Sequence, residues 1–349
     1  MSVRQLGAPE DLETPRPLPA RSPVPERITA IAATADLSRV AIATATPWFR
    51  EFSEVLLLAE GTVVRLSVPG RRRVLDLVFD PDGSALTAME SGNSIYRWSF
   101  NAPGEPWTRA MTGGGGGDGP DLAQAAASGD GRFFATSNAF SRNVVVRDAA
   151  TRRVVHDIEN IFEGLAHQDR IQGEGTVALN ADGSRLAFST ARRWSSKEGV
   201  VVQEIGSRAC TEYRTGIPWV NGLAFGPDGA ALAVVGARPD ETVATVVDLD
   251  DPAAGPEPMV LPTGERVDRI NLRPVWCGAE PLVPIVDQRR VTVWNLATAS
   301  ARLSVDAPGP RIAAALTPDG RTLVIASPDD GVQAHSLPFS PPDEEDPLR

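Results

Sequence analysis

Apolar residues in this chain form short runs separated by polar turns, and one such unit recurs seven times. In its clearest copy, Leu77–Ala88, an apolar run ends at Pro81-Asp82-Gly83 and a second apolar run follows. The other copies keep this order more or less closely: Ala32–Ala43, Ala126–Thr136, Ala178–Thr190, Ala224–Val235, Ala315–Ala326 and, with two extra residues around Pro274, Asn271–Val286.

The residues of each turn predict a β-hairpin. Proline presets φ, aspartate can accept a hydrogen bond from its own backbone two residues on, and glycine tolerates positive φ. The flanking runs are rich in Val, Leu, Ile and Phe, as paired strands require. Each copy is therefore expected to contribute two neighbouring antiparallel strands.

The spacing of the copies predicts the fold. The residue before each turn aspartate, or its equivalent, is at 35, 81, 129, 181, 227, 274 and 318, so the steps are 46, 48, 52, 46, 47 and 44 residues. A repeat of this length, with room for four short strands, is the period of a β-propeller blade. We expect an all-β, seven-bladed β-propeller of four-stranded antiparallel blades over residues 28–339.

The two ends of the chain lie outside this repeat. The seventh repeat stops after two or three strands, so the N-terminal segment 1–27 is expected to supply the outer strand that closes the ring. Its Pro-rich part, 15–24, suits an edge strand, and a leader without structure is the alternative. Residues 340–349 are acidic and Pro-rich, which predicts a disordered tail.

Charge and cysteine content narrow the function. The net charge of −11 argues against a nucleic-acid binder, because such proteins neutralise phosphates with a basic surface. The two cysteines, Cys210 and Cys277, lie in different repeats without a metal-binding motif, which predicts free thiols in a reducing compartment. Met1–Pro25 has no apolar core of a signal peptide, and no membrane span is apparent, so the expected location is the cytoplasm.

Several third strands carry a recognisable pattern after the hairpin. The stretch Asp287–Thr298 and the stretch Ser327–Ser336 resemble the WD-repeat β-propellers, and the resemblance extends over residues 28–337. The signature dipeptide is degenerate, with Trp98-Ser99, Arg147-Asp148 and Trp294-Asn295 in its place. The resemblance is to a degenerate bacterial form and implies a protein-binding scaffold. Bacterial PD-type repeats and lactonase-like propellers share the same hairpin and remain alternatives.

Catalytic patterns are sparse. His156, His167 and His335 form no metal-binding pair, and His156 and His335 fall in expected strands. Asp80 and Asp82 are interpreted as turn residues, and the Gly113–Gly119 stretch as a linker. No cofactor, metal or catalytic residue is therefore predicted. For a lactonase-like hydrolase at the central mouth, the one local cluster is Asp121, His167, Asp169 and Glu174.

Arg and aromatic residues recur at the positions that should surround one mouth of the ring. The residues nine positions before each turn aspartate, or its equivalent, include Arg27, Arg73, Trp219 and Arg266, and Arg311 lies one position from this register. The expected second-to-third connections add Trp48, Phe49, Arg50, Phe52, Phe140, Arg142, Arg192, Arg193, Trp194 and Arg238.

Arg and aromatic residues are enriched in protein-binding hot spots. We therefore expect a non-enzymatic scaffold, a monomer or a subunit of a hetero-complex, that binds an acidic or peptide-like partner and neither nucleic acid nor membrane. A sensor of a small anion at the mouth is a further alternative. In a purely structural interpretation, the Arg side chains pair with local acids such as Asp76, Asp169 and Asp268.

Overall fold

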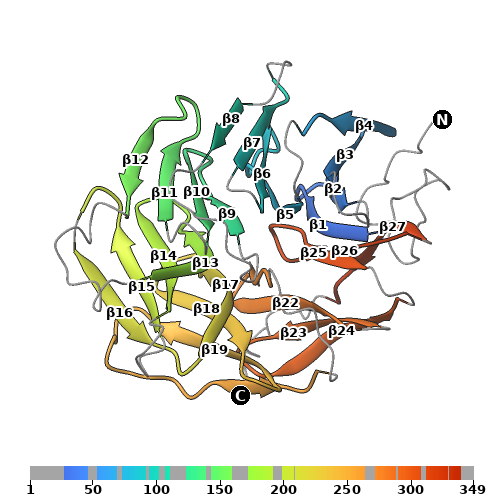
Figure 1. Cartoon of the computed structure of the whole chain (residues 1–349). Helices are drawn as coiled ribbons and strands as arrows, with labels where there is room; N and C mark the ends of the chain where they lie inside the picture. The colour runs from blue at the N-terminus through green and yellow to red at the C-terminus, as the bar shows by residue number, and fades with distance from the viewer. Residues whose placement is uncertain are drawn as a thin grey trace, which may run out of the picture.

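The strands of this protein form seven antiparallel sheets arranged as blades around a ring (Figure 1). The structure, a computed structural model, describes residues 27–45, 53–68, 73–91, 94–101, 107–110, 123–138, 143–158, 172–191, 199–207, 209–263, 272–287, 290–307, 312–328 and 330–338. It confirms the expected all-β, seven-bladed propeller. The described residues include no helix long and apolar enough to cross a membrane.

Blades one to four each contain four strands, ordered from the centre of the ring outwards. Blade one consists of β1 (Arg27–Ala33), β2 (Arg39–Ala45), β3 (Ser53–Ala59) and β4 (Thr62–Leu66). Blade two consists of β5 (Val74–Phe79), β6 (Ala85–Glu90), β7 (Ser94–Ser99) and β8 (Trp107–Ala110). Blade three consists of β9 (Ala123–Ala127), β10 (Phe133–Asn138), β11 (Asn143–Asp148) and β12 (Val154–Asp157). Blade four consists of β13 (Gln172–Leu179), β14 (Arg185–Ala191), β15 (Gly199–Glu204) and β16 (Cys210–Arg214).

Blades five and six repeat this order, and blade seven is shorter. Blade five consists of β17 (Trp219–Phe225), β18 (Ala231–Ala237), β19 (Thr242–Asp248) and β20 (Met259–Leu261). Blade six consists of β21 (Val275–Cys277), β22 (Glu280–Val286), β23 (Arg290–Asn295) and β24 (Ser300–Asp306). Blade seven has three strands within the described residues, as expected: β25 (Ala313–Leu316), β26 (Thr322–Ser327) and β27 (Gly331–Ser336). Segment 15–24, the expected fourth strand, lies outside the described residues.

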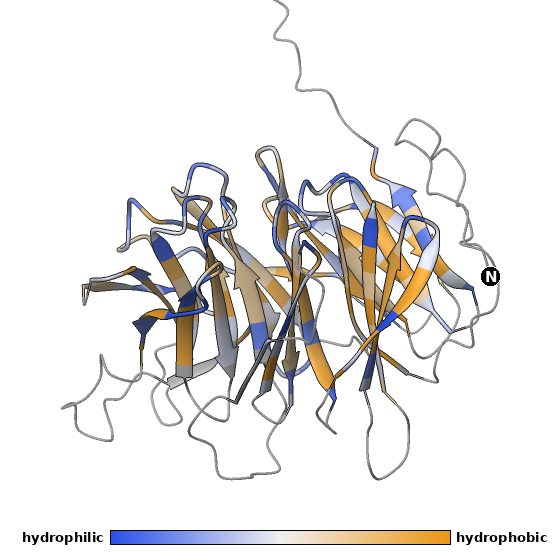
Figure 2. Cartoon of the chain, turned by 90° about the horizontal axis from the view of Figure 1, so that it is seen from above, coloured by the Kyte–Doolittle hydropathy of each residue, from blue (hydrophilic) through white to orange (hydrophobic). Residues whose placement is uncertain are grey.

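The hydrophobic core is divided into layers between neighbouring blades. Seven clusters of buried side chains fill the seven interfaces, because the middle strands of each blade bury side chains on both faces of the sheet. In the layer that closes the ring, Ile28, Ile31 and Val40 of blade one pack against Val324 and Val332 of blade seven. Figure 2 shows the ring turned by 90° from Figure 1, with hydrophobic residues (orange) along the strands.

The turns between first and second strands have the predicted chemistry. In six of them the aspartate Oδ1 accepts the N–H of the residue two positions on, at 2.9 to 3.1 Å. The residue directly after the aspartate has positive φ in all six turns. It is glycine in five blades and Leu37 (φ 57°) in blade one. Aspartate and glycine therefore fix the backbone of these turns.

The repeat in blade six is displaced from the predicted alignment. Pro274 was expected in the turn, but β21 and β22 are joined at Gly278-Ala279, where Gly278 has φ 59°. Cys277 pairs with Glu280 across this tight turn. Of the two residues in this hairpin turn, only Gly278 has positive φ, and a glycine at that position is sufficient for a tight turn. The hairpin therefore forms without a Pro-Asp-Gly sequence.

Candidate partner-binding surfaces

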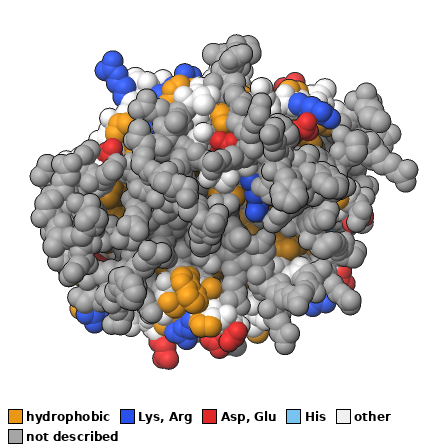
Figure 3. Space-filling model, viewed as in Figure 1, with side chains coloured by type: hydrophobic (Ala, Val, Ile, Leu, Met, Phe, Trp, Pro, Cys, Tyr) orange, Lys and Arg blue, Asp and Glu red, His pale blue; other side chains and the backbone are white. Residues whose placement is uncertain are grey.

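The two faces of the ring have different connections. The inner strands begin on one face, where the second-to-third connections also lie, and we call it the mouth face. The opposite face carries the turns from first to second and from third to fourth strands, and we call it the turn face. Figure 3 shows the molecule as viewed in Figure 1, with several described Arg side chains (blue) exposed on the visible side.

Most of the predicted partner-binding residues lie outside the part of the chain whose side chains are described. These are Arg27, at the start of β1, and the residues Trp48, Phe49, Arg50, Arg142, Arg192, Arg193, Trp194, Arg266 and Arg311. Their prediction therefore stays a prediction. Among the residues that the structure describes, Arg73 and Trp219 represent this set.

Trp219 is the prominent described side chain of the set. It is the first residue of β17, and 47% of it is exposed. Its backbone is fixed, because Trp219 pairs with Ala237 of β18 and its carbonyl oxygen lies against Gly236, where an added Cβ would approach to 2.0 Å. A rigid backbone therefore presents an exposed indole ring at the start of an inner strand.

The two described arginines near this face differ in their surroundings. Arg73 precedes β5 and is half-buried, and its carbonyl oxygen accepts the N–H of Ser91 at 2.8 Å. Arg238, in the connection between β18 and β19, lies 3.9 Å from Glu241 and donates to the carbonyl oxygen of Gly216 at 3.4 Å. Pairing with local groups therefore accounts for Arg238.

A partly buried ion pair crosses the centre of the ring. Asp76 on β5 of blade two is 3% exposed, and it accepts a hydrogen bond at 3.0 Å from Nε of Arg273, which precedes β21 in blade six. Arg273 Nη2 also contacts the second carboxylate oxygen of Asp76 and donates to the carbonyl oxygen of Ala125 at 2.7 Å. Arg273 therefore links blade six to blades two and three, which lie across the ring (Figure 1).

The environment of Asp76 contains opposing influences. Burial raises the pKa of the Asp76 carboxyl above its ordinary value, and Arg273 and the amide donors of Ala125 and Leu77 counteract part of this rise. The Ala125 amide donates at 2.7 Å and the Leu77 amide at 2.9 Å. In the purely structural interpretation Asp76 pairs with an arginine of the mouth, but its partner in the structure is Arg273, which was not among the arginines selected from the sequence.

Further polar side chains tie the inner strands together. Gln124 of β9 donates to the carbonyl oxygen of Asn221 on β17 at 2.8 Å, and Thr176 of β13 donates to that of Val220 at 2.9 Å. Gln124 and Thr176 are 3% and 1% exposed. Because each bond joins different blades, these side chains stabilise the ring, and their hydrogen-bonding groups are already engaged.

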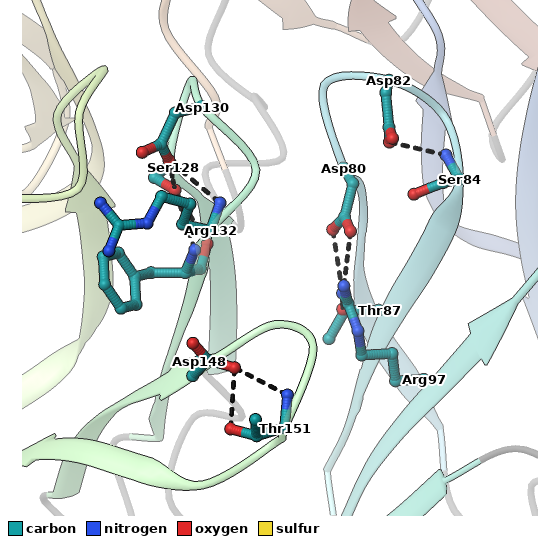
Figure 4. Close-up of polar contacts among 11 residues, drawn as sticks. Asp80, Asp82, Ser84, Thr87, Arg97, Ser128, Asp130, Arg132, Asp148 and Thr151 are labelled. Atoms are coloured by element: carbon teal, nitrogen blue, oxygen red, sulfur yellow. Dashed lines mark hydrogen bonds and ion pairs between the residues drawn. The ribbon is translucent and has the colours of Figure 1, made fainter.

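On the turn face, one predicted turn residue has another role. Asp82 accepts the N–H of Ser84 at 2.9 Å, as expected, but the Asp80 carboxylate turns towards Arg97 on β7 (Figure 4). Arg97 Nη1 lies 2.9 Å from Asp80 and 2.8 Å from the Thr87 hydroxyl. Asp80 and Arg97 have side chains that are 8% and 6% exposed. The sequence interpretation of Asp80 as a turn residue was therefore wrong for its side chain, which forms a buried ion pair.

In blades one, three and seven a hydroxyl group occupies the position of Asp80. Ser128 donates to Asp130 at 2.6 Å and accepts the N–H of Phe133 at 3.0 Å (Figure 4). Thr34 and Thr317 make the same two bonds. The first turn position thus closes the turn locally in these blades, whereas Asp80 connects the turn to the third strand.

The cluster that was considered for a hydrolase has no described side chain. Asp121, His167 and Asp169 lie outside the described residues, and so does the side chain of Glu174, on β13. The described residues contain no group of three or more metal-ligating side chains. His156, on β12, accepts the N–H of Gly206 at 3.3 Å. Burial lowers the pKa of His335 on β27 below its ordinary value.

The third-strand residues that carry the WD-like pattern are buried. Trp98, Arg147 and Trp294 are 5%, 5% and 8% exposed. The indole nitrogens of Trp98 and Trp294 are buried without a hydrogen-bond partner in the described structure. These tryptophans therefore contribute packing rather than a hydrogen-bond network.

No protein-family model matches this chain, and no curated protein matches its sequence.

Both cysteines are free, as predicted, with Cys210 exposed and Cys277 half-buried. The fold is a seven-bladed β-propeller, and its finer family assignment rests on the sequence resemblance alone.

Proposed function

We propose that this protein is a non-enzymatic scaffold of the WD-repeat type, which binds an acidic, peptide-like segment of a partner protein through its mouth face. The observation that carries the proposal is Trp219, an exposed aromatic side chain on a rigid inner strand. Large aromatic side chains with a fixed backbone are typical anchors of protein interfaces.

The sequence supports an acidic partner. The Arg and aromatic residues expected around the mouth combine planar cations with apolar area, a combination that suits carboxylate recognition. In a chain with a net charge of −11, a local group of arginines on one face would attract acidic segments, whereas the remaining surface would repel them.

The centre of the ring supports a scaffold over a sensor of small anions. The guanidinium group of Arg273 lies there and is engaged by Asp76 and Ala125. Its charge is therefore balanced within the protein. The free thiols fit a reducing compartment, since exposed thiols such as Cys210 oxidise in secreted proteins.

The proposal is tested by affinity capture of the tagged protein from its native cells, followed by mass spectrometry. The wild type is compared with the double variant Arg73→Glu/Arg266→Glu. A double variant away from the mouth, Arg65→Glu/Arg321→Glu, is the control, because Arg65 is exposed on the outer strand of blade one and Arg321 is exposed on the turn face. It changes the net charge equally.

We expect the wild type and the control to retain the same protein, and the mouth variant to lose most of it. Equal retention by both double variants would show that binding does not use this face. Metal analysis of the purified protein tests the hydrolase alternative separately, because a stoichiometric bound metal would favour an enzyme at the mouth.

A further inference from the structure

A groove lies between the outer parts of blades two and three, away from the mouth of the ring. It has a volume of about 430 Å³ and is lined by Trp107 and Thr108 of β8, Arg147 of β11, Thr151 and Arg152 of the following turn, and Val154 of β12. The outer strands β8 and β12 pair with one neighbour each in the described structure. Nothing in the proposed scaffold function uses this groove.

One wall of the groove is held by a stack of aromatic and cationic side chains. Trp107 meets Phe134 edge-on, with ring centroids 6.1 Å apart and an interplanar angle of 79°. Behind Phe134 lies the guanidinium of Arg97, 4.8 Å from the ring centroid, which the buried pair with Asp80 fixes in place. The wall is therefore preorganised, and binding would not need to order it.

The groove is positively charged in an acidic protein. Arg147 is 5% exposed, and its guanidinium carbon lies 5.9 Å from the Trp107 ring centroid. Arg152 is exposed at the tip of the turn. Among the described residues that line the groove there is no carboxylate. The carboxylate of Asp148 bonds to Thr151 of this lining, so one negative charge adjoins two arginines and the local charge is net positive. A ligand with a negative charge is therefore attracted here, although the net charge of the chain is −11.

The groove also presents apolar surface. Val154, which lines the groove, is 48% exposed although it lies in a strand. Valine next to an indole ring binds an aliphatic side chain and offers nothing to a free inorganic anion. The combination fits a peptide that carries a carboxylate next to an aliphatic residue.

The backbone at Arg152 provides a way to test its side chain. Arg152 has φ 62°, a left-handed conformation that favours glycine, and its N–H donates to the carbonyl oxygen of Asp148 at 2.8 Å. Thr151 closes the same turn through Asp148, at 2.8 Å between the two side chains (Figure 4). Replacement by glycine therefore relieves backbone strain while it removes the guanidinium group.

We propose that this groove is a second docking site, which binds a short acidic peptide segment of a partner protein. Its carboxylate pairs with the exposed guanidinium group of Arg152, close to the buried charge of Arg147, and an aliphatic neighbour packs against Trp107 and Val154. The site is separate from the mouth face, so it stands or falls independently of the function proposed above.

The test is a fluorescence anisotropy titration of the full chain with a labelled peptide of alternating Glu and Val residues. We expect saturable binding that weakens when salt is raised, because exposed charge pairs are screened. Arg152→Glu and Arg152→Gly should each weaken binding about tenfold, which is the effect of losing one charge-assisted contact. Arg152→Lys should retain most of it.

Three controls make the result decisive. Arg65→Glu changes the net charge as Arg152→Glu does, but at an exposed side chain of β4 in blade one, and should have no effect. A peptide of alternating Lys and Val should not bind, and inorganic phosphate should not compete at millimolar concentration. Equal loss with Arg65→Glu, unchanged binding by Arg152→Gly, or full competition by phosphate would each overturn the proposal.

Discussion

The two faces of this propeller differ in what their side chains do. On the turn face, short connections of repeated sequence close themselves through Asp, Ser, Thr and Gly, and most of their polar groups bond within the turn. On the mouth face, the connections differ in length and sequence from blade to blade, and the described Trp219 is exposed there. The difference indicates that the first-to-second turns stabilise the fold, whereas the mouth-face connections are free to vary, as the proposed recognition of a partner requires.

The first-to-second turns also differ from one another in the role of their first residue. In blades one, three and seven the first turn residue is a Ser or Thr that bonds locally, whereas in blade two Asp80 pairs with Arg97. All these turns keep the same backbone, because the following Asp and the residue with positive φ determine it. The first position can therefore specialise without altering the fold.

The largest expected effect comes from breaking the buried ion pair of blade two. Arg97→Ala leaves the Asp80 carboxylate buried without its partner, so the free energy of unfolding should fall by about 3–5 kcal/mol. Denaturant unfolding measures it. The double variant Asp80→Leu/Arg97→Met removes both charges and should recover much of the loss; if it is as unstable as Arg97→Ala, the charge argument is wrong.

A smaller loss of stability is expected when a turn glycine is replaced by alanine, and two glycines distinguish backbone strain from a steric clash. Gly131 and Gly183 have φ 71° and 67°, but an added Cβ would lie 3.7 Å from Pro81 in the first case and 2.4 Å from the Phe133 ring in the second. Gly131→Ala should cost about 1–2 kcal/mol, the strain of the left-handed conformation alone. Gly183→Ala should cost clearly more. Equal losses in thermal or denaturant unfolding would contradict the assignment of the difference to Phe133.

Removal of one turn hydroxyl should have a modest effect. Ser128→Ala deletes the bonds to Asp130 and to the Phe133 amide, and should lower the free energy of unfolding by about 1 kcal/mol. Blade five provides the comparison, since Gly226 occupies this position and the turn still forms, with Asp228 bonded to the Ala230 amide. A loss as large as that of Arg97→Ala would show that the hydroxyl, rather than Asp and Gly, determines the turn.

The smallest effect concerns pH. The hydroxyl and amide of Ser184 lower the pKa of Asp182 below its ordinary value of 3.8. Since the folded pKa is below the unfolded pKa, this stabilisation is complete above pH 3.8 and is lost as the pH falls through the folded value. In thermal unfolding between pH 6 and pH 2, Asp182→Asn should therefore lose less stability on acidification than the wild type does. An identical pH profile would remove Asp182 from the account.

Much of the turn face could be predicted from the sequence. The Asp and Gly of each turn act over two or three residues, so a local pattern is sufficient to place them. The prediction failed in blade six, where the hairpin uses Gly278 instead of a Pro-Asp-Gly turn.

The remaining features depend on residues that are distant in sequence. Asp76 and Arg273 are 197 positions apart, and no local pattern relates them until the ring closes. The groove between blades two and three likewise combines Trp107 with Val154, which belong to different repeats. A sequence pattern identifies each residue's strand, but the contact between blades follows from the three-dimensional packing.

The most direct test of the central claim measures binding and stability together for Trp219→Ala. The affinity of the variant for the protein captured by the wild type is compared with its thermal unfolding. We predict that affinity falls at least about tenfold while the unfolding midpoint stays within about 1–2 °C of the wild type, because the indole is an exposed anchor. Unchanged affinity, or a loss of binding that only accompanies unfolding, would contradict the proposal that the mouth face binds the partner.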